Sequence, residues 1–166
     1  MKPITPEQLL DARTWADCAD ATASAAPHAS QALFGISLSS EDSAAVEALF
    51  EFVWPYALKG GWRHIYLGSP VPGLARWQQA NPDQPVEAYV FAKRSGLPRD
   101  PQLRYYWGKG FKRIVACKPN YFPHEASLDY GAVIRGRIPL SALAPLWTRL
   151  PLPWLQGFKR FLFAVL

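Results

Sequence analysis

The stretch DPQLRYYWGKGFKRIVACKPNYFPHEASLDYGAVIRGR, residues 100–137, decides the fold that the sequence predicts. It opens with Asp100 and Pro101, a helix start in which the carboxylate accepts backbone N–H groups and proline occupies the first helical position. A short helix is expected over residues 101–107, ended by the glycines that follow. A capped helix therefore leads into the rest of this segment.

Two strands are expected after that helix. Residues 111–118 alternate as a strand does, with Ile114 and Ala116 on one face. Residues 119–127 form a connecting loop. Residues 129–138 then interleave β-branched side chains with arginines, which indicates a second strand.

The part of the chain before this segment predicts a strand, a helix and a strand. Residues 32–39 form a compact apolar strand, and residues 39–42 open the longest helix of the chain, which ends at Lys59. A second strand follows over residues 62–67. Elements in this order form a right-handed βαβ unit with parallel strands, so the fold class is α/β.

Several short motifs occur in a fixed order along the chain. They are Gly68-Ser-Pro-Val-Pro-Gly-Leu74, Glu87-Ala-Tyr-Val90, Asp100-Pro-Gln-Leu103, Tyr106-Trp-Gly-Lys-Gly-Phe111, Tyr121-Phe-Pro123 and Ser127-Leu-Asp-Tyr-Gly131. Their order and approximate spacing resemble a subgroup of the GNAT (Gcn5-related N-acetyltransferase) superfamily. The resemblance covers residues 14–138, and it implies a mixed sheet flanked by helices, shortened at its N-terminal side.

The GNAT resemblance also implies a cofactor and a site. The two parallel strands would be a splayed central pair, and acetyl-CoA or another acyl-CoA would enter between them. The residues implied for cofactor binding are Ile36, Ser37, Leu38, Ser39, Ser43 and Ala44, and a backbone N–H near Ser37 to Ser39 would hold the oxyanion. The residues expected to contact substrate are Gly68, Ser69 and Tyr121. The Pro/Gly loop that begins at Gly68 is equally typical of plain turn chemistry.

Tyr106 is the candidate catalytic residue. It lies near the end of the helix expected over residues 101–107, where a phenol could donate a proton to a leaving group. The resemblance gives it that role toward the leaving thiolate. The other interpretation is that Tyr106 and its aromatic neighbours form an apolar core face.

The sequence departs from the GNAT pattern in two places. The loop that normally cradles the cofactor diphosphate with backbone N–H groups reads EDSAAV at residues 41–46, without glycines and with Glu41 in place of a basic residue. Glu41 and Asp42 also suit an ordinary acidic helix cap. In addition, only about thirty residues precede Leu33. We therefore expect one of two explanations. Either Met1 is a late start within a longer ancestral reading frame, or another chain, such as a second copy in a homodimer, completes the fold.

Composition and charge narrow the class of protein. The chain has 166 residues, 49% of them hydrophobic, which argues for one folded domain. Residues 1–92 carry a net charge of −5 and residues 93–166 one of +10. The basic half suits an anionic ligand, an acidic protein, nucleic acid or an anionic membrane, but no nucleic-acid motif is present, so nucleic acid is not an expected partner.

Cys18 and Cys117 lack metal-ligand spacing, which predicts a reduced, cytoplasmic protein without a metal.

The sequence predicts a GNAT-like domain over residues 1–138 and an apolar, basic extension over residues 139–166. Residues 154–166 pack either on the open edge of the sheet, which is the favoured interpretation, or on a partner or anionic membrane surface. Three functions remain open: transfer of an acyl group from acyl-CoA to a small-molecule or protein amine acceptor, non-catalytic binding or assembly by a degenerate GNAT-like module, and a peripheral membrane role of the extension.

Overall fold

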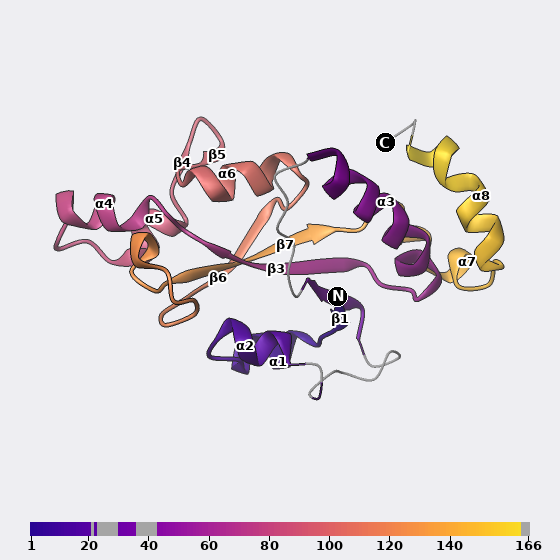
Figure 1. The fold of residues 1–166 in the computed structure, drawn as a ribbon, viewed down its shortest axis with the longest axis horizontal. Helices are drawn as coiled ribbons and strands as arrows, with labels where there is room; N and C mark the ends of the chain where they lie inside the picture. The colour runs from indigo at the N-terminus through magenta and orange to yellow at the C-terminus, as the bar shows by residue number, and fades with distance from the viewer. Residues whose placement is uncertain (21, 23–29, 36–42, 164–166) are drawn as a thin grey trace.

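The computed structural model describes residues 1–20, 22, 30–35 and 43–163 of the chain. Within those residues, five strands form one sheet in the order β1-β2-β3-β7-β6 (Figure 1). Their bounds are Lys2–Pro3 for β1, Ala32–Gly35 for β2, His64–Pro70 for β3, Arg113–Lys118 for β6 and Gly131–Arg137 for β7. Of these pairs, β2 and β3 are parallel and the other three are antiparallel, so the sheet is mixed.

The predicted βαβ unit is confirmed. Helix α3 (Ser43–Lys59) connects β2 to β3, and the register pairs Ala32 with His64 and Gly35 with Leu67. The predicted strand over residues 32–39 is described only to Gly35, because residues 36–42 lie outside the described part of the chain.

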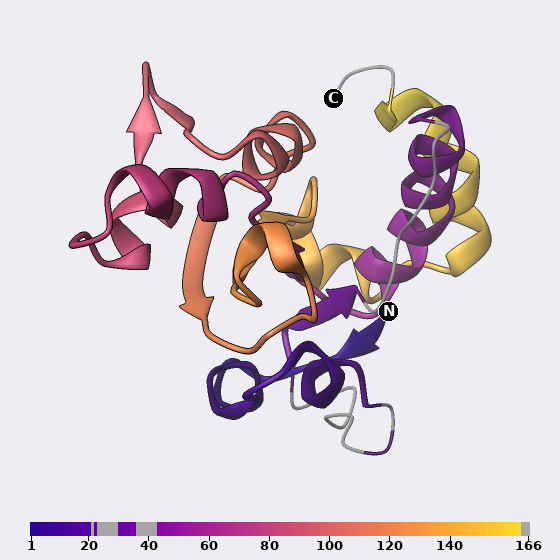
Figure 2. The ribbon, with the colours of Figure 1, turned by 60° about the vertical axis from the view of Figure 1, so that its left-hand side comes forward.

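The sheet carries helices on both faces (Figures 1 and 2). One face packs against α3, α4 (Leu74–Ala80), α5 (Val86–Val90) and α6 (Pro101–Gly108), and its core includes Trp54, Leu74 and Leu103. The other face packs against α1 (Pro6–Asp11) and α2 (Trp15–Ala19), with Leu9 and Phe34 in its core.

The N-terminal helices show how local capping chemistry divides a segment. Thr5 caps α1 through a capping box with Gln8, and Thr14 caps α2 through a second capping box with Asp17. The second capping box starts a new helix four residues after α1 ends. The chain therefore forms two short helices here.

The helix and strands of residues 100–137 form as predicted, with one correction. Asp100 caps α6, and β6 and β7 pair as antiparallel neighbours. Between Ile114 and Ala116 the register shifts, so Ile114 packs in the core on the α3 side and Ala116 in the core on the α1 side. The prediction that these two residues share a face was wrong, because a bulge adds one residue and reverses the alternation.

A small hairpin that was not predicted precedes α6. Strands β4 (Lys93–Arg94) and β5 (Leu97–Pro98) pair as antiparallel neighbours across Ser95 and Gly96. Both of these turn residues have positive φ angles, 52° and 79°, as a tight hairpin turn requires. Helix α5 therefore ends at Val90, before the hairpin begins.

The C-terminal segment folds back on α3. After the short helices η2 (Ser141–Leu143) and α7 (Ala144–Trp147), helix α8 (Leu152–Phe163) runs beside α3, with Leu155 buried between them. Lys59 donates hydrogen bonds to the carbonyls of Thr148 and Leu150 and ties the two segments together. The sheet edge beside β2 carries β1 instead of this segment. Among the described helices, none has the length and apolar character to cross a membrane.

Candidate functional site

The predicted cofactor-binding residues come after the described part of β2. The described pairing of β2 with β3 stops at Gly35 and Leu67, whereas β3 continues through Pro70 with β7 as its neighbour. Ile36, Ser37, Leu38 and Ser39, predicted to bind the cofactor, follow Gly35 directly and lie outside the described residues, as do Glu41 and Asp42. Ser43 and Ala44 begin α3, with Ala44 exposed. Their roles stay predictions.

Tyr106 lies on α6, on the face of the sheet that also carries α3. Its half-buried ring packs edge-on against Phe111 at 5.9 Å and against Tyr105 at 5.4 Å between ring centroids. Burial raises the pKa of its hydroxyl above the ordinary value of 10, and a hydrogen bond with Gln102 partly offsets this rise. The phenol is therefore protonated at neutral pH and is able to donate a proton.

Gly68 and Tyr121 come together on the opposite face of the sheet. A methyl group added at Gly68 would lie 2.8 Å from Cε1 of Tyr121, and 3.0 Å from Phe122 and Trp15. The buried Tyr121 hydroxyl donates a hydrogen bond to Sγ of Cys18 at 3.3 Å, and burial raises the pKa of Tyr121 well above 10. This aromatic cover explains why the position needs glycine.

Ser69 points to the other side of β3. Side chains alternate along a strand, so Ser69 shares a face with Ile65 and Leu67 in the core on the α3 side. Its hydroxyl is fully buried and donates to the carbonyl of Pro70 at 2.9 Å. Tyr106 and Ser69 thus belong to one face, and Gly68 and Tyr121 to the other.

Asp100 joins the loop after β3 to helix α6. The carboxylate is fully buried. Its Oδ1 accepts hydrogen bonds from the backbone N–H groups of Gln102 and Leu103. Its Oδ2 accepts hydrogen bonds from the Gly73 N–H and from the Tyr89 hydroxyl, both at 3.0 Å. The sequence predicts the helix cap but not the two donors from distant segments. This carboxylate therefore fixes the loop relative to the helix that carries Tyr106.

Ser127 holds the same loop from the other side. Its buried Oγ accepts the Val71 N–H at 2.8 Å and lies 2.7 Å from Nδ1 of His124. A motif that contains Ser127 was part of the GNAT resemblance, but nothing local in the sequence indicates the bond to Val71. The strand-end loop is thus fixed at two points, as a preorganised binding loop requires.

Among the described residues, no group of three or more His, Cys, Asp or Glu side chains is arranged to hold a metal ion. The site residues that the structure describes offer backbone groups, aromatic rings and the phenols of Tyr106 and Tyr121. Such a set can bind an extended ligand and transfer a proton.

Comparison with known proteins relates the fold to solved structures. No protein-family model and no curated protein matches the chain. The loading GNATL domain of CurA from Lyngbya majuscula matches 82% of this chain and 68% of its own, with 19% identity and a TM-score of 0.61. The GphF GNAT-like decarboxylase, solved in complex with isobutyryl-CoA, matches 82% of this chain and 69% of its own, with 23% identity and a TM-score of 0.59. The chain therefore has a GNAT-like fold.

Proposed function

We propose that this chain is an acyl-CoA-dependent enzyme that transfers the acyl group to an amine acceptor. The observation that supports it is the GNAT-like fold, in which β2 and β3 form a parallel pair connected by α3. One structure of similar fold holds isobutyryl-CoA.

In this proposal Tyr106 is the general acid. The amine attacks the thioester carbonyl, the C–N bond forms and the C–S bond breaks. The phenol proton passes to the leaving sulfur, and the amine proton is released to water. The raised pKa of Tyr106 keeps its hydroxyl protonated at neutral pH, so a proton is in place when the thiolate leaves.

Decarboxylation of a carboxyacyl-CoA is the second candidate function. One similar structure is a decarboxylase, and this chemistry needs a proton donor but no amine. The C–C bond to the carboxylate breaks, CO2 leaves, and the Tyr106 proton passes to the resulting carbanion. The half-buried aromatic surroundings of Tyr106 favour release of a neutral product.

Cofactor binding is tested first, by thermal unfolding with acetyl-CoA and isobutyryl-CoA. Ligand at a hundred times its Kd stabilises a fold by about 2.7 kcal/mol, a shift of several degrees in Tm. No shift at millimolar concentrations of either thioester would contradict the proposal and leave the non-catalytic binding module as the better description.

Catalysis is tested with Tyr106→Phe, and Tyr105→Phe serves as the matched control because that ring is exposed on the same helix. We expect turnover to fall about 100-fold in Tyr106→Phe and to stay within about twofold in the control. Mass spectrometry of the products with acetyl-CoA plus an amine panel, and with malonyl-CoA alone, separates the two reactions. Equal rates in both variants would remove Tyr106 from the mechanism.

A further inference from the structure

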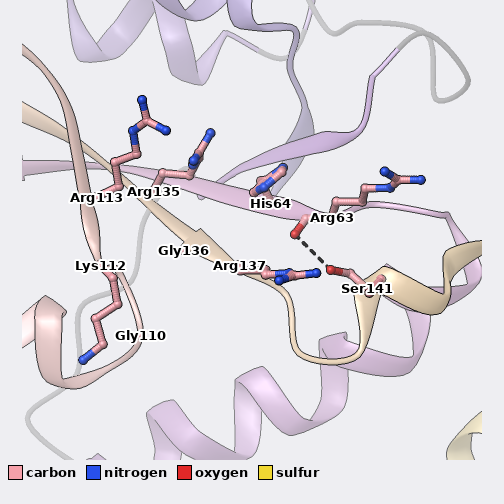
Figure 3. Close-up of a pocket in the computed structure, with 10 residues that line it drawn as sticks. Arg63, His64, Gly110, Lys112, Arg113, Arg135, Gly136, Arg137 and Ser141 are labelled. Carbon is pink, nitrogen blue, oxygen red and sulfur yellow. Dashed lines mark hydrogen bonds between the residues drawn. The ribbon is translucent and has the colours of Figure 1, made fainter.

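A basic hollow lies at the end of the sheet where β3 begins and β7 ends. It has a volume of about 410 Å³, which is in the range of small-molecule sites. Its basic and imidazole side chains are Arg63, His64, Lys112, Arg113, Arg135 and Arg137 (Figure 3). The strand-end loop after Pro70 is six residue steps further along β3, or about 20 Å away, so the hollow is separate from that loop.

The strand register brings these cations together. Arg113 of β6 lies directly opposite Arg135 of β7, and His64 of β3 lies directly opposite Arg137. Figure 3 shows Arg113 and Arg135 extended side by side, with His64 on the same side of the sheet and Lys112 on the other. Like charges directly opposite one another destabilise a sheet, so packing alone gives no reason for this arrangement.

No carboxylate offsets this charge within the part of the chain that the structure describes. The acidic side chains of α1 and α2 bind elsewhere or face solvent; Asp17, for example, accepts the backbone N–H groups of Arg13 and Thr14. Arg135 is half-buried, and Arg113 and Arg137 are exposed. Their donors are available to an anion.

The backbone around the hollow is rigid. The Arg63 carbonyl accepts hydrogen bonds from the Ile138 N–H at 2.9 Å and from the Ser141 hydroxyl at 3.3 Å. The Arg63 N–H donates to the Gln31 carbonyl at 2.8 Å. The cations therefore project from fixed strands, which lowers the entropy lost when a ligand binds.

The pKa of His64 depends on the charges of the arginines around the hollow. Burial, followed by Arg135, Arg137 and Arg63, lowers the pKa of its imidazole below the ordinary value of 6.5. An anion bound among the same arginines would offset their charge and raise that pKa. A rise in the pKa of His64 is therefore a measurable sign of anion binding in the hollow.

We propose that this hollow binds the diphosphate or triphosphate group of a small ligand, with Arg113, Arg135 and Arg137 as the anion-binding side chains. Guanidinium groups pair with phosphate oxygens through two parallel hydrogen bonds, so neighbouring arginines suit a group with several phosphates. A compact hollow favours a small ligand over nucleic acid, which needs an extended basic surface. This proposal is independent of acyl-CoA binding.

Calorimetric titration with inorganic pyrophosphate and tripolyphosphate, at 50 and 200 mM salt, tests the proposal. We expect Arg135→Gln and Arg113→Gln each to weaken binding about tenfold or more. Arg94→Gln removes the same charge from the β4–β5 hairpin and is the matched control, with affinity unchanged. NMR titration of His64 should show its pKa rising when pyrophosphate is present.

The stability of the unliganded variants separates a binding role from a structural one. Arg135→Gln removes a like-charge contact, so its Tm should rise by about 1–3 °C while affinity falls. A lower Tm, an unmoved His64 resonance, or equal weakening by Arg94→Gln would each overturn the proposal. If Arg135→Gln loses acyl-CoA binding as well as pyrophosphate binding, the two sites are not separate.

Discussion

The two ends of strand β3 satisfy their polar groups in opposite ways. At its C-terminal end the loop is held by groups of the protein itself: Asp100 accepts four donors and Ser127 accepts the Val71 N–H. At its N-terminal end Arg113, Arg135 and His64 face a hollow, and the described residues provide no anion there. Internal bonds fix a loop in place, whereas unmatched charge leaves binding capacity for a ligand.

The largest expected effect comes from breaking the C-terminal end. Asp100→Ala removes the acceptor of four donors that are buried or partly buried. Unpaired buried donors each cost about 1–3 kcal/mol, so we expect a loss of about 3–5 kcal/mol in the free energy of unfolding, measured with urea. Asp83→Asn, at an exposed carboxylate, is the control and should change stability by less than about 0.5 kcal/mol. A loss below about 1 kcal/mol in Asp100→Ala would show that the loop does not depend on this carboxylate.

Gly68→Ala tests the aromatic cover on β3. The added methyl group would overlap with Tyr121, Phe122 and Trp15, and such overpacking typically costs about 1–3 kcal/mol. The matched control is Gly108→Ala at the end of α6, where no atom lies within 4 Å of the added methyl group and the helix should gain up to about 1 kcal/mol. Differential scanning calorimetry should therefore show a lower Tm for Gly68→Ala and a higher Tm for Gly108→Ala than for the wild type. A neutral Gly68→Ala would mean that the rings adjust freely.

The smallest expected effect is the pH dependence of stability at the N-terminal end. Because the folded state lowers the pKa of His64 below 6.5, the unfolded chain binds more protons as pH falls through that value. His64 therefore makes the protein less stable below about pH 6.5 and has no such effect above it. His64→Asn should flatten the decrease in unfolding free energy between pH 7 and pH 5. Identical pH profiles for wild type and His64→Asn would contradict the lowered pKa.

These tests also separate the proposals from each other. The proposed acyl-CoA reaction uses Tyr106, and Tyr106→Phe should leave pyrophosphate binding unchanged. Arg135→Gln should leave thioester turnover unchanged. The two ends of β3 are therefore independent in function if each variant affects one readout alone.

The sequence by itself determined the local elements. Asp100 and Pro101 mark the start of α6, and the apolar strands around the long helix indicate the parallel β2–α3–β3 unit. Helix caps, glycine turns and strand alternation act between residues a few positions apart, so they are legible without a fold. The motif order was sufficient to indicate the GNAT-like fold.

Only the tertiary structure decided which distant groups meet. The bulge in β6 moved Ala116 to the other face, and packing brought Gly73 and Tyr89 to the Asp100 carboxylate. The sequence showed a basic C-terminal half, but strand register alone placed Arg113 opposite Arg135. Such contacts depend on register and on the face of a sheet, and a shift of one residue reverses both. For that reason the basic hollow could not be read from the order of the residues.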